Sequence, residues 1–230
     1  MTRTVGVLGG MGPAATADFY TRLVAATGAE RDQDHLRVLI DSNPRLPCRV
    51  SALADRGASP GPELAAMARG LERAGAELLV MPCNTAHAWA DEIRAAVTSP
   101  LLDMVEATVE AALAARPGLR RVGVLATAAA LDAGLYDHAF GARGVALIRT
   151  GPDARARFAA LVARVKTGDV GPEVRSGMAE LARALIQDGA EAIVAGCTEV
   201  PLVLEAEAVG APLISSTDAL VEATLRAARA

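Results

Sequence analysis

The chain has 230 residues and a net charge of −4, from 23 basic and 27 acidic side chains. Hydrophobic residues make up 52% of it, but aromatic residues only 3%. The acidic balance and the scarcity of aromatic rings argue against a nucleic-acid-binding surface. The apolar runs stop well short of the roughly 20 residues that a membrane span needs. We therefore expect a cytoplasmic protein with no membrane segment, large enough for one or two α/β domains.

Short apolar runs alternate with amphipathic segments along the whole chain. The runs are predicted strands, at residues 4–9, 37–40, 77–81, 121–126, 144–148, 192–195 and 211–214. The intervening segments are predicted helices, at residues 14–26, 62–74, 86–97, 104–115, 155–166, 173–188 and 216–229. This alternation predicts an α/β fold whose mostly parallel sheets are flanked by helices.

The chain also repeats itself. VGVLGG at 5–10 resembles VGVLAT at 122–127, and AGAELLV at 74–80 resembles DGAEAIV at 188–194. Gly6 precedes Cys83 by 77 positions, and Gly123 precedes Cys197 by 74. Features that recur in one order at nearly one spacing predict two homologous, pseudo-symmetric α/β halves. We expect residues 1–98 with 210–230 to form the first half and residues 99–209 to form the second.

Cys83 and Cys197 each follow a predicted strand, and polar residues come directly after them. Ligands of parallel α/β sheets bind outside the carboxyl ends of strands. If the two halves face each other, the two thiols meet in a cleft between them. The alternative for each cysteine is a small buried hydrophobe, but Asn84, Thr85 and Thr198 suit a polar site better.

Two thiols could serve three kinds of chemistry. A redox pair is disfavoured because no CxxC motif is present, and three cysteines do not suggest a disulfide framework. A zinc site could use Cys83, His87 and either Cys48 or Cys197, but the familiar ligand spacings are missing. The third kind is proton transfer by two bases. A thiol with a pKa of about 8.5 needs only a modest local field to act as a base, and two such groups could invert an α-carbon.

Such a reaction places charge on the substrate carboxylate, which needs preorganised donors. GGMGPAAT at 9–16 is a glycine-rich turn that leads into a helix, where free N–H groups bind anions. An ordinary strand–helix turn is the alternative. SNPRLPCR at 42–49 offers Arg45 and Arg49 for a distal carboxylate, although either could be a solvated loop arginine. His87 and Glu199 could tune the thiols or help to deprotonate them.

GGMGPAAT, SNPRLPCR, PCNTAH and GCTE, in this order, resemble the aspartate/glutamate racemase family. This family comprises cofactor-independent two-cysteine amino-acid racemases, typified by aspartate racemase. The resemblance covers nearly the whole chain. It implies two α/β domains, an amino-acid substrate, no pyridoxal phosphate or metal, and a homodimer.

The resemblance also implies roles for individual residues. Cys83 and Cys197 would be the acid/base pair. Positions that match the family's substrate-binding residues are Met11, Gly12, Arg49, Asn84, Thr85, Thr127, Lys166 and Thr198. Arg49 and Lys166 would bind the side-chain carboxylate of the substrate.

Two positions depart from the family pattern, and both bear on the choice of substrate. Cys48 stands where the family has an aspartate before Arg49, and Ala130 stands where a second threonine is common. A hydantoin racemase, a maleate isomerase or an arylmalonate decarboxylase therefore stays open as an alternative. So does a non-catalytic binder of acidic amino acids.

Overall fold

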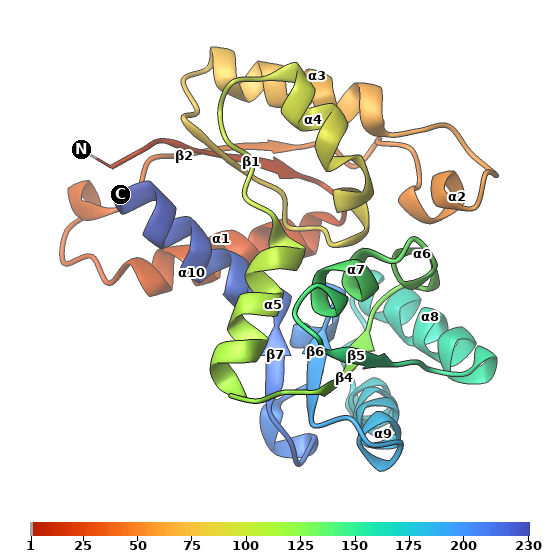
Figure 1. Ribbon diagram of the computed structural model, residues 1–230. Helices are drawn as coiled ribbons and strands as arrows, with labels where there is room; N and C mark the ends of the chain where they lie inside the picture. The colour runs from red at the N-terminus through yellow and green to blue at the C-terminus, as the bar shows by residue number, and fades with distance from the viewer. Residues whose placement is uncertain (1) are drawn as a thin grey trace. The chain divides into compact units, whose positions relative to one another are not determined.

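The computed structural model describes residues 2–230, which form two compact units (Figure 1). The first unit runs to Ala107 and resumes at Thr217, and the second unit is Thr108–Ser216. None of the helices in the described part of the chain is long and apolar enough to cross a membrane.

The first unit contains a parallel three-stranded sheet. β1 (Val5–Gly9) lies in the centre, between β2 (Val38–Ser42) and β3 (Leu78–Val80). An isolated parallel bridge from Leu79 to Leu101 extends the sheet beyond β3. All residues of β1 and β3 are buried, as expected for parallel strands that are covered on both faces.

Helices cover both faces of this sheet. α3 (Gly61–Arg73) and α4 (Ala90–Ala96) contribute to one buried apolar cluster, and α1 (Pro13–Thr27) and α10 (Ser216–Arg229) contribute to another. The remaining elements here are the 3-10 helices η1 (Asp32–Asp34) and η2 (Thr85–Trp89) and the helices α2 (Arg49–Leu53) and α5 (Met104–Ala115). α5 begins in the first unit and continues into the second.

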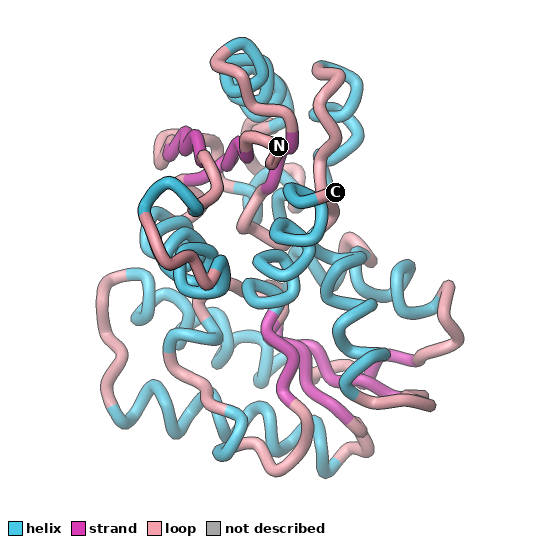
Figure 2. Tube along the Cα trace, turned by 90° about the vertical axis from the view of Figure 1, so that its left-hand side faces the viewer, coloured by secondary structure: helices cyan, strands magenta, loops and turns pink. Residues whose placement is uncertain are grey.

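The second unit contains a parallel four-stranded sheet, whose strands are drawn in magenta in Figure 2. β4 (Arg121–Leu125) lies between β5 (Ala146–Ile148) and β6 (Ala192–Ala195), and β7 (Leu213–Ser215) pairs with β6. The other elements are α6 (Ala128–Asp132), α7 (Leu135–Gly141), α8 (Pro152–Lys166), α9 (Pro172–Gln187), η3 (Val200–Leu202) and η4 (Ala206–Ala208).

The sequence repeat is visible as a repeated packing arrangement. Gly6 of β1 pairs with Leu79 of β3, and Gly123 of β4 pairs with Ile193 of β6. A Cβ on Gly6 would lie 2.7 Å from the Cβ of Ala76, and one on Gly123 would lie 2.8 Å from Cδ1 of Ile193. Each central strand therefore uses glycine so that neighbouring side chains can approach it closely.

The second half ends later than the sequence suggested. Residues 210–230 were expected in the first half, but β7 bonds to β6 through a register that pairs Ala195 with Ser215. The backbone N–H of Ile193 also donates to Pro212 O at 2.9 Å. These ladder bonds hold the strand in the second sheet, and only the chain from Thr217 onward belongs to the first unit. The first division also lies later, between Ala107 and Thr108 rather than after residue 98.

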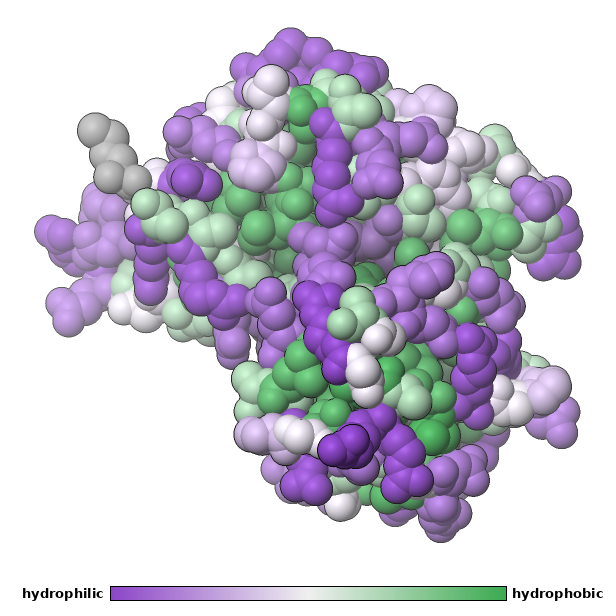
Figure 3. Space-filling view, in the orientation of Figure 1, coloured by the Kyte–Doolittle hydropathy of each residue, from purple (hydrophilic) through white to green (hydrophobic). Residues whose placement is uncertain are grey.

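Hydrophilic side chains cover much of the molecular face in Figure 3, with smaller apolar patches among them. The large apolar side chains that are exposed within residues 2–230 are Tyr20, Val24, Ile40, Val50 and Val170.

Candidate functional site

The two sheet registers place Cys83 and Cys197 at equivalent positions. Gly6 pairs with Leu79 in the first sheet, and Gly123 pairs with Ile193 in the second. Each cysteine lies four residues beyond the strand residue in its pair, at the carboxyl end of its strand. Both cysteines are free thiols with 7% of their surface exposed. The duplication therefore provides one buried thiol at the same point of each sheet.

Polar residues follow each thiol and are buried with it. Asn84 and Thr85 follow Cys83 with 2% and 8% exposure, and Thr198 and Glu199 follow Cys197 with 3% and 5%. Buried polar side chains are costly unless they are hydrogen-bonded, so their concentration after both thiols indicates a functional site.

In the second unit, Cys197 is bonded to a carboxylate. Its Sγ lies 3.0 Å from Oε2 of Glu199, and the Thr198 hydroxyl lies 3.3 Å from the same oxygen. Burial raises the pKa of the Cys197 thiol well above its ordinary value, and the charge of Glu199 raises this pKa further. Cys197 therefore rests as a thiol that donates its hydrogen to Glu199.

Lys166, the last residue of α8, lies on the outer side of this carboxylate. Its Nζ is 3.9 Å from Oε1 of Glu199, and its side chain is 47% exposed. The charge of Lys166 lowers the pKa of Cys197, although less than burial raises it. The second unit thus brings Cys197, Thr198, Glu199 and Lys166 together.

In the first unit, His87 contacts the main chain of Cys83. Nδ1 of His87 lies 2.9 Å from Cys83 O, and the backbone N–H of Met104 donates to Nε2 at 3.0 Å. Burial lowers the pKa of His87, which favours the neutral ring. With both ring nitrogens engaged by the main chain, this geometry does not support the expected acid/base role of His87.

The glycine-rich turn and the arginine loop lie in the same unit as Cys83. Met11 is buried in the same apolar cluster as Cys83, and Gly12 directly precedes α1. Gly12 O accepts the N–H and the hydroxyl of Thr16, both at 3.1 Å. Arg49 is the first residue of α2 and is half-buried, and its Nη1 donates to Pro47 O at 3.1 Å.

Thr127 follows β4 and caps α6. Its hydroxyl accepts the N–H of Ala130 at 3.2 Å. Ala130, which departs from the family pattern, is therefore bonded to Thr127 through its backbone.

Cys48, the other position that departs from this pattern, is exposed at the start of α2. Hydrogen bonding from Ser51 lowers the pKa of its thiol.

Asp103 interacts electrostatically with His87 and is not among the residues predicted from the sequence. Its Oδ1 accepts the N–H groups of Val105 and Glu106 at 2.9 and 3.2 Å, and its Oδ2 pairs with Arg94 at 3.0 Å. An aspartate directly before a predicted helix at 104–115 is a recognisable cap, so this much could have been predicted. Its position beside His87 could not.

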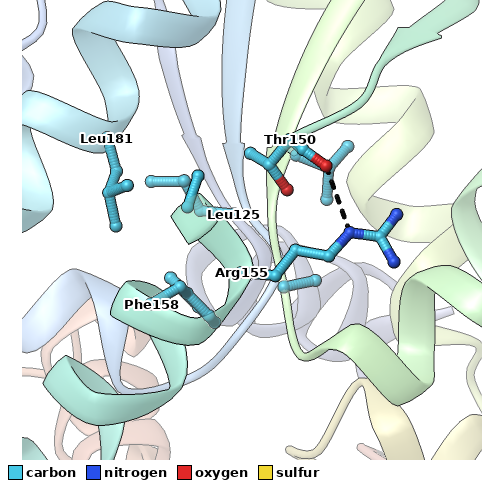
Figure 4. A pocket seen from close by; sticks show the side chains of 8 residues that line it. Leu125, Thr150, Arg155, Phe158 and Leu181 are labelled. Atoms are coloured by element: carbon cyan, nitrogen blue, oxygen red, sulfur yellow. Dashed lines mark hydrogen bonds between the residues drawn. The ribbon is translucent and has the colours of Figure 1, made fainter. Parts of the chain in front are cut away.

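The second unit also has a small pocket under the end of β4 (Figure 4). It is lined by Leu125, Thr150, Arg155, Phe158 and Leu181 among others, and Arg155 Nε donates to Thr150 O at 3.2 Å. It has no space for a water-sized sphere. A surface groove of about 390 Å³ beside α9 is lined by Arg175, Arg183 and Glu205 with four other residues. Neither contains a predicted site residue.

Within residues 2–230, no group of three or more His, Cys, Asp or Glu side chains is arranged to hold a metal ion.

A sequence profile of the family described as Asp/Glu/hydantoin racemase matches residues 8–224. The chain belongs to this family. It is 27% identical over 228 residues to the broad specificity amino-acid racemase RacX of Bacillus subtilis, with 96% of each chain covered. It is 37% identical to the glutamate racemase of Pseudomonas aeruginosa over 136 residues, which are 56% of this chain and 48% of that one.

The aspartate racemase of Picrophilus torridus is a similar solved structure. It is 28% identical in sequence and has a TM-score of 0.86, with 99% of this chain and 94% of that chain covered. The comparisons confirm the family resemblance and the α/β class with helix-flanked parallel sheets. Membership in a racemase family supports an isomerase.

Proposed function

We propose that this protein is a cofactor-independent racemase that interconverts the L and D forms of aspartate, glutamate or a close relative. The observation that carries the proposal is the equivalence of Cys83 and Cys197 in the two sheet registers. A two-base racemase needs one proton-transfer group for each face of the α-carbon, and a duplicated fold with one thiol in each half supplies such a pair. The proposal includes a cytoplasmic homodimer.

The proposed reaction exchanges one proton for another. A thiolate on one cysteine removes the α-proton. The electron pair of the broken C–H bond stays on the α-carbon, as a planar carbanion conjugated with the carboxylate. The thiol of the other cysteine then donates its proton to the opposite face. The enzyme ends with the protonation states of the two sulfurs exchanged. When Cys197 must act as the base, Glu199 accepts the thiol proton across their 3.0 Å contact.

The remaining residues would hold the substrate. Buried Asn84, Thr85 and Thr198, with Met11 and Gly12, are the proposed contacts of the α-carboxylate, where charge develops in the transition state. Arg49 and Lys166 would select an acidic side chain, and Thr127 would contribute to the same pocket. The contact of Lys166 with Glu199 gives this lysine a second role, in the charge balance around Cys197.

The proposal is tested by incubating the purified protein, with no added cofactor, with L-aspartate or L-glutamate in heavy water. We expect deuterium at the α-carbon by NMR and loss of optical rotation for at least one of them. Cys83→Ser and Cys197→Ser should each reduce racemisation by at least about 1,000-fold, because each direction needs both groups. Cys48→Ser is the matched control and should retain activity. A wild-type protein that exchanges no α-proton of either amino acid would contradict the proposal.

A further inference from the structure

We propose that His87 is a positioning residue that fixes the main chain of Cys83 and ties it to the first turn of α5. The proposal rests on the proposed role of Cys83 as a proton-transfer group. It is carried by two contacts inside the first unit, from Nδ1 of His87 to Cys83 O and from Met104 N–H to Nε2.

The hydrogen bonds define the tautomer of the ring. A backbone N–H can only donate, so Nε2, which receives the N–H of Met104 at 3.0 Å, must be the unprotonated nitrogen. The proton of the neutral ring is then on Nδ1, which donates to Cys83 O at 2.9 Å. The ring lies in the buried part of η2, with 6% of its surface exposed. His87 is therefore fully bonded, and it has no proton to exchange with a substrate.

These contacts restrain Cys83 from both sides. The N–H of Cys83 donates to Met81 O at 2.8 Å, and the C=O of Cys83 accepts from His87. With both peptide groups bonded, the main chain of Cys83 is restrained, and the side-chain torsion is the main freedom left to the sulfur. Proton transfer requires the reacting atoms to be held about 3–3.5 Å apart, and an error of 1 Å can cost about 100-fold in rate. A pinned main chain at a thiol meets this requirement.

The other end of the His87 ring completes the cap of α5. Asp103 accepts the N–H groups of Val105 and Glu106 through its side chain and that of Ala107 through its carbonyl. His87 accepts the remaining N–H of the first turn, that of Met104. Because the first N–H groups of a helix have no partner inside it, one imidazole satisfies both a helix end and the carbonyl of Cys83.

Two conservative variants separate the two bonds. The Nδ2 of asparagine overlaps Nδ1 of histidine, so His87→Asn keeps the donor to Cys83 O and loses the acceptor for Met104. Oε1 of glutamine overlaps Nε2, so His87→Gln keeps the acceptor and loses the donor. We expect His87→Gln to lower kcat about 100-fold with KM changed less than about threefold, and His87→Asn to keep kcat within about threefold of the wild type. His138→Gln, on an exposed helical histidine, is the matched control.

A second readout does not depend on racemisation. In a Cys48→Ser, Cys197→Ser background, the rate at which iodoacetamide alkylates Cys83 reports the local environment of that thiol. We expect His87→Gln to change this rate at least about fivefold and His87→Asn to leave it within about twofold. If the wild type racemises nothing, the proposed function fails, yet the alkylation rates still test the positioning of Cys83.

Nitrogen NMR of the wild-type ring tests the proposal even if both variants fail to fold. We expect the Nδ1–H tautomer, neutral at pH 7. A protonated ring or the Nε2–H tautomer would overturn the proposal. So would equal kcat and equal alkylation rates in His87→Gln and His87→Asn.

Discussion

Cys83 and Cys197 occupy equivalent positions, but the residues two places beyond them differ. Thr85 follows the first thiol at this distance, and Glu199 follows the second. The carboxylate of Glu199 lies 3.0 Å from the sulfur of Cys197, and Lys166 approaches the far oxygen of this carboxylate at 3.9 Å. The pseudo-symmetric fold therefore supports two thiols with different electrostatic surroundings.

This cluster predicts opposite effects for two substitutions. Burial and then Glu199 raise the pKa of Cys197, whereas Lys166 lowers it. Glu199→Gln should therefore lower this pKa, and Lys166→Met should raise it. The pH dependence of iodoacetamide alkylation, measured in a Cys48→Ser, Cys83→Ser background, gives the midpoint of thiolate formation. Midpoints that move in the same direction in both variants would contradict the arrangement.

At the residue scale, the sequence predicts the thiols and Glu199 because they follow strand ends within a few positions. The role of His87 could not be predicted in this way. Its two partners are backbone groups, Cys83 O and the N–H of Met104, and the second lies 17 positions away. Side-chain motifs contain no information about which peptide group a ring will reach.

Among the elements, the two central strands are the repeated unit of the fold. A Cβ on Gly6 would lie within 3.0 Å of Ala76 and Leu79, and one on Gly123 within 3.0 Å of Ile193 and Leu185. Gly6→Ala and Gly123→Ala should therefore each lower the free energy of unfolding by about 1–3 kcal/mol, the usual cost of overpacking. Urea denaturation measures this quantity.

The control for this pair is Gly70→Ala. Gly70 lies inside α3, and a Cβ there would meet nothing within 4 Å. Alanine is favoured over glycine in a helix, so the variant should be about 0.5–1 kcal/mol more stable than the wild type. Stability that is unchanged in both strand variants would show that the strands are not packed as described.

Glu72 of α3 anchors the segment that leads to the bridge at Leu101. One of its oxygens, Oε1, accepts the N–H and hydroxyl groups of Thr98 and Ser99 at 2.7–3.0 Å. These bonds, led by the Ser99 N–H, lower the pKa of Glu72 to about 2. Because the pKa is lowered on folding, the stabilisation is complete above the ordinary carboxyl pKa and is lost as the pH falls towards 2.

Glu72→Gln should therefore lower Tm at pH 7, where the charged acceptor is lost. The difference in Tm from the wild type should shrink as the pH falls from about 4.5 towards 2. Thermal unfolding followed by circular dichroism across this range checks both points. A difference that is constant with pH would show that the charge of Glu72 is not involved.

The strands and the long helices could be predicted from the sequence pattern, and the short helices could not. All seven strands lie at or within two residues of their predicted ranges, because each coincides with a short, mostly apolar run of the sequence. α2, α6 and α7 have five to seven residues, which is too short for a helical period to be recognised. The sequence analysis placed β7 in the first half, whereas it pairs with β6. Strand pairing is set by tertiary packing, which the sequence of the strand alone does not reveal.

For the whole molecule, the second unit is one continuous segment inserted into the first. Residues 108–216 contain all four strands of the second sheet and its buried apolar cluster. The first unit is assembled from two separate segments, because Leu220, Val221 and Ala228 of α10 are buried in one cluster with Val5 and Val7 of β1. Autonomous folding is thus expected of the second unit and not of the first segment alone.

Three fragments and one linked protein test this division. Residues 108–216 should fold and unfold cooperatively in urea. Residues 99–209, the boundaries expected from the sequence, lack β7 and should be markedly less stable, because β6 keeps β4 but loses its second partner at Leu213–Ser215. Residues 1–107 should stay unfolded, since burial of each large apolar side chain of α10 contributes about 1.5–3 kcal/mol to a total stability of about 5–15 kcal/mol. Joining residues 1–107 to 217–230 through a short Gly-Ser linker should restore a cooperative transition.

The outcome that would contradict this division concerns the second unit. Equal stability of the 108–216 and 99–209 fragments would show that β7 is dispensable to the second sheet.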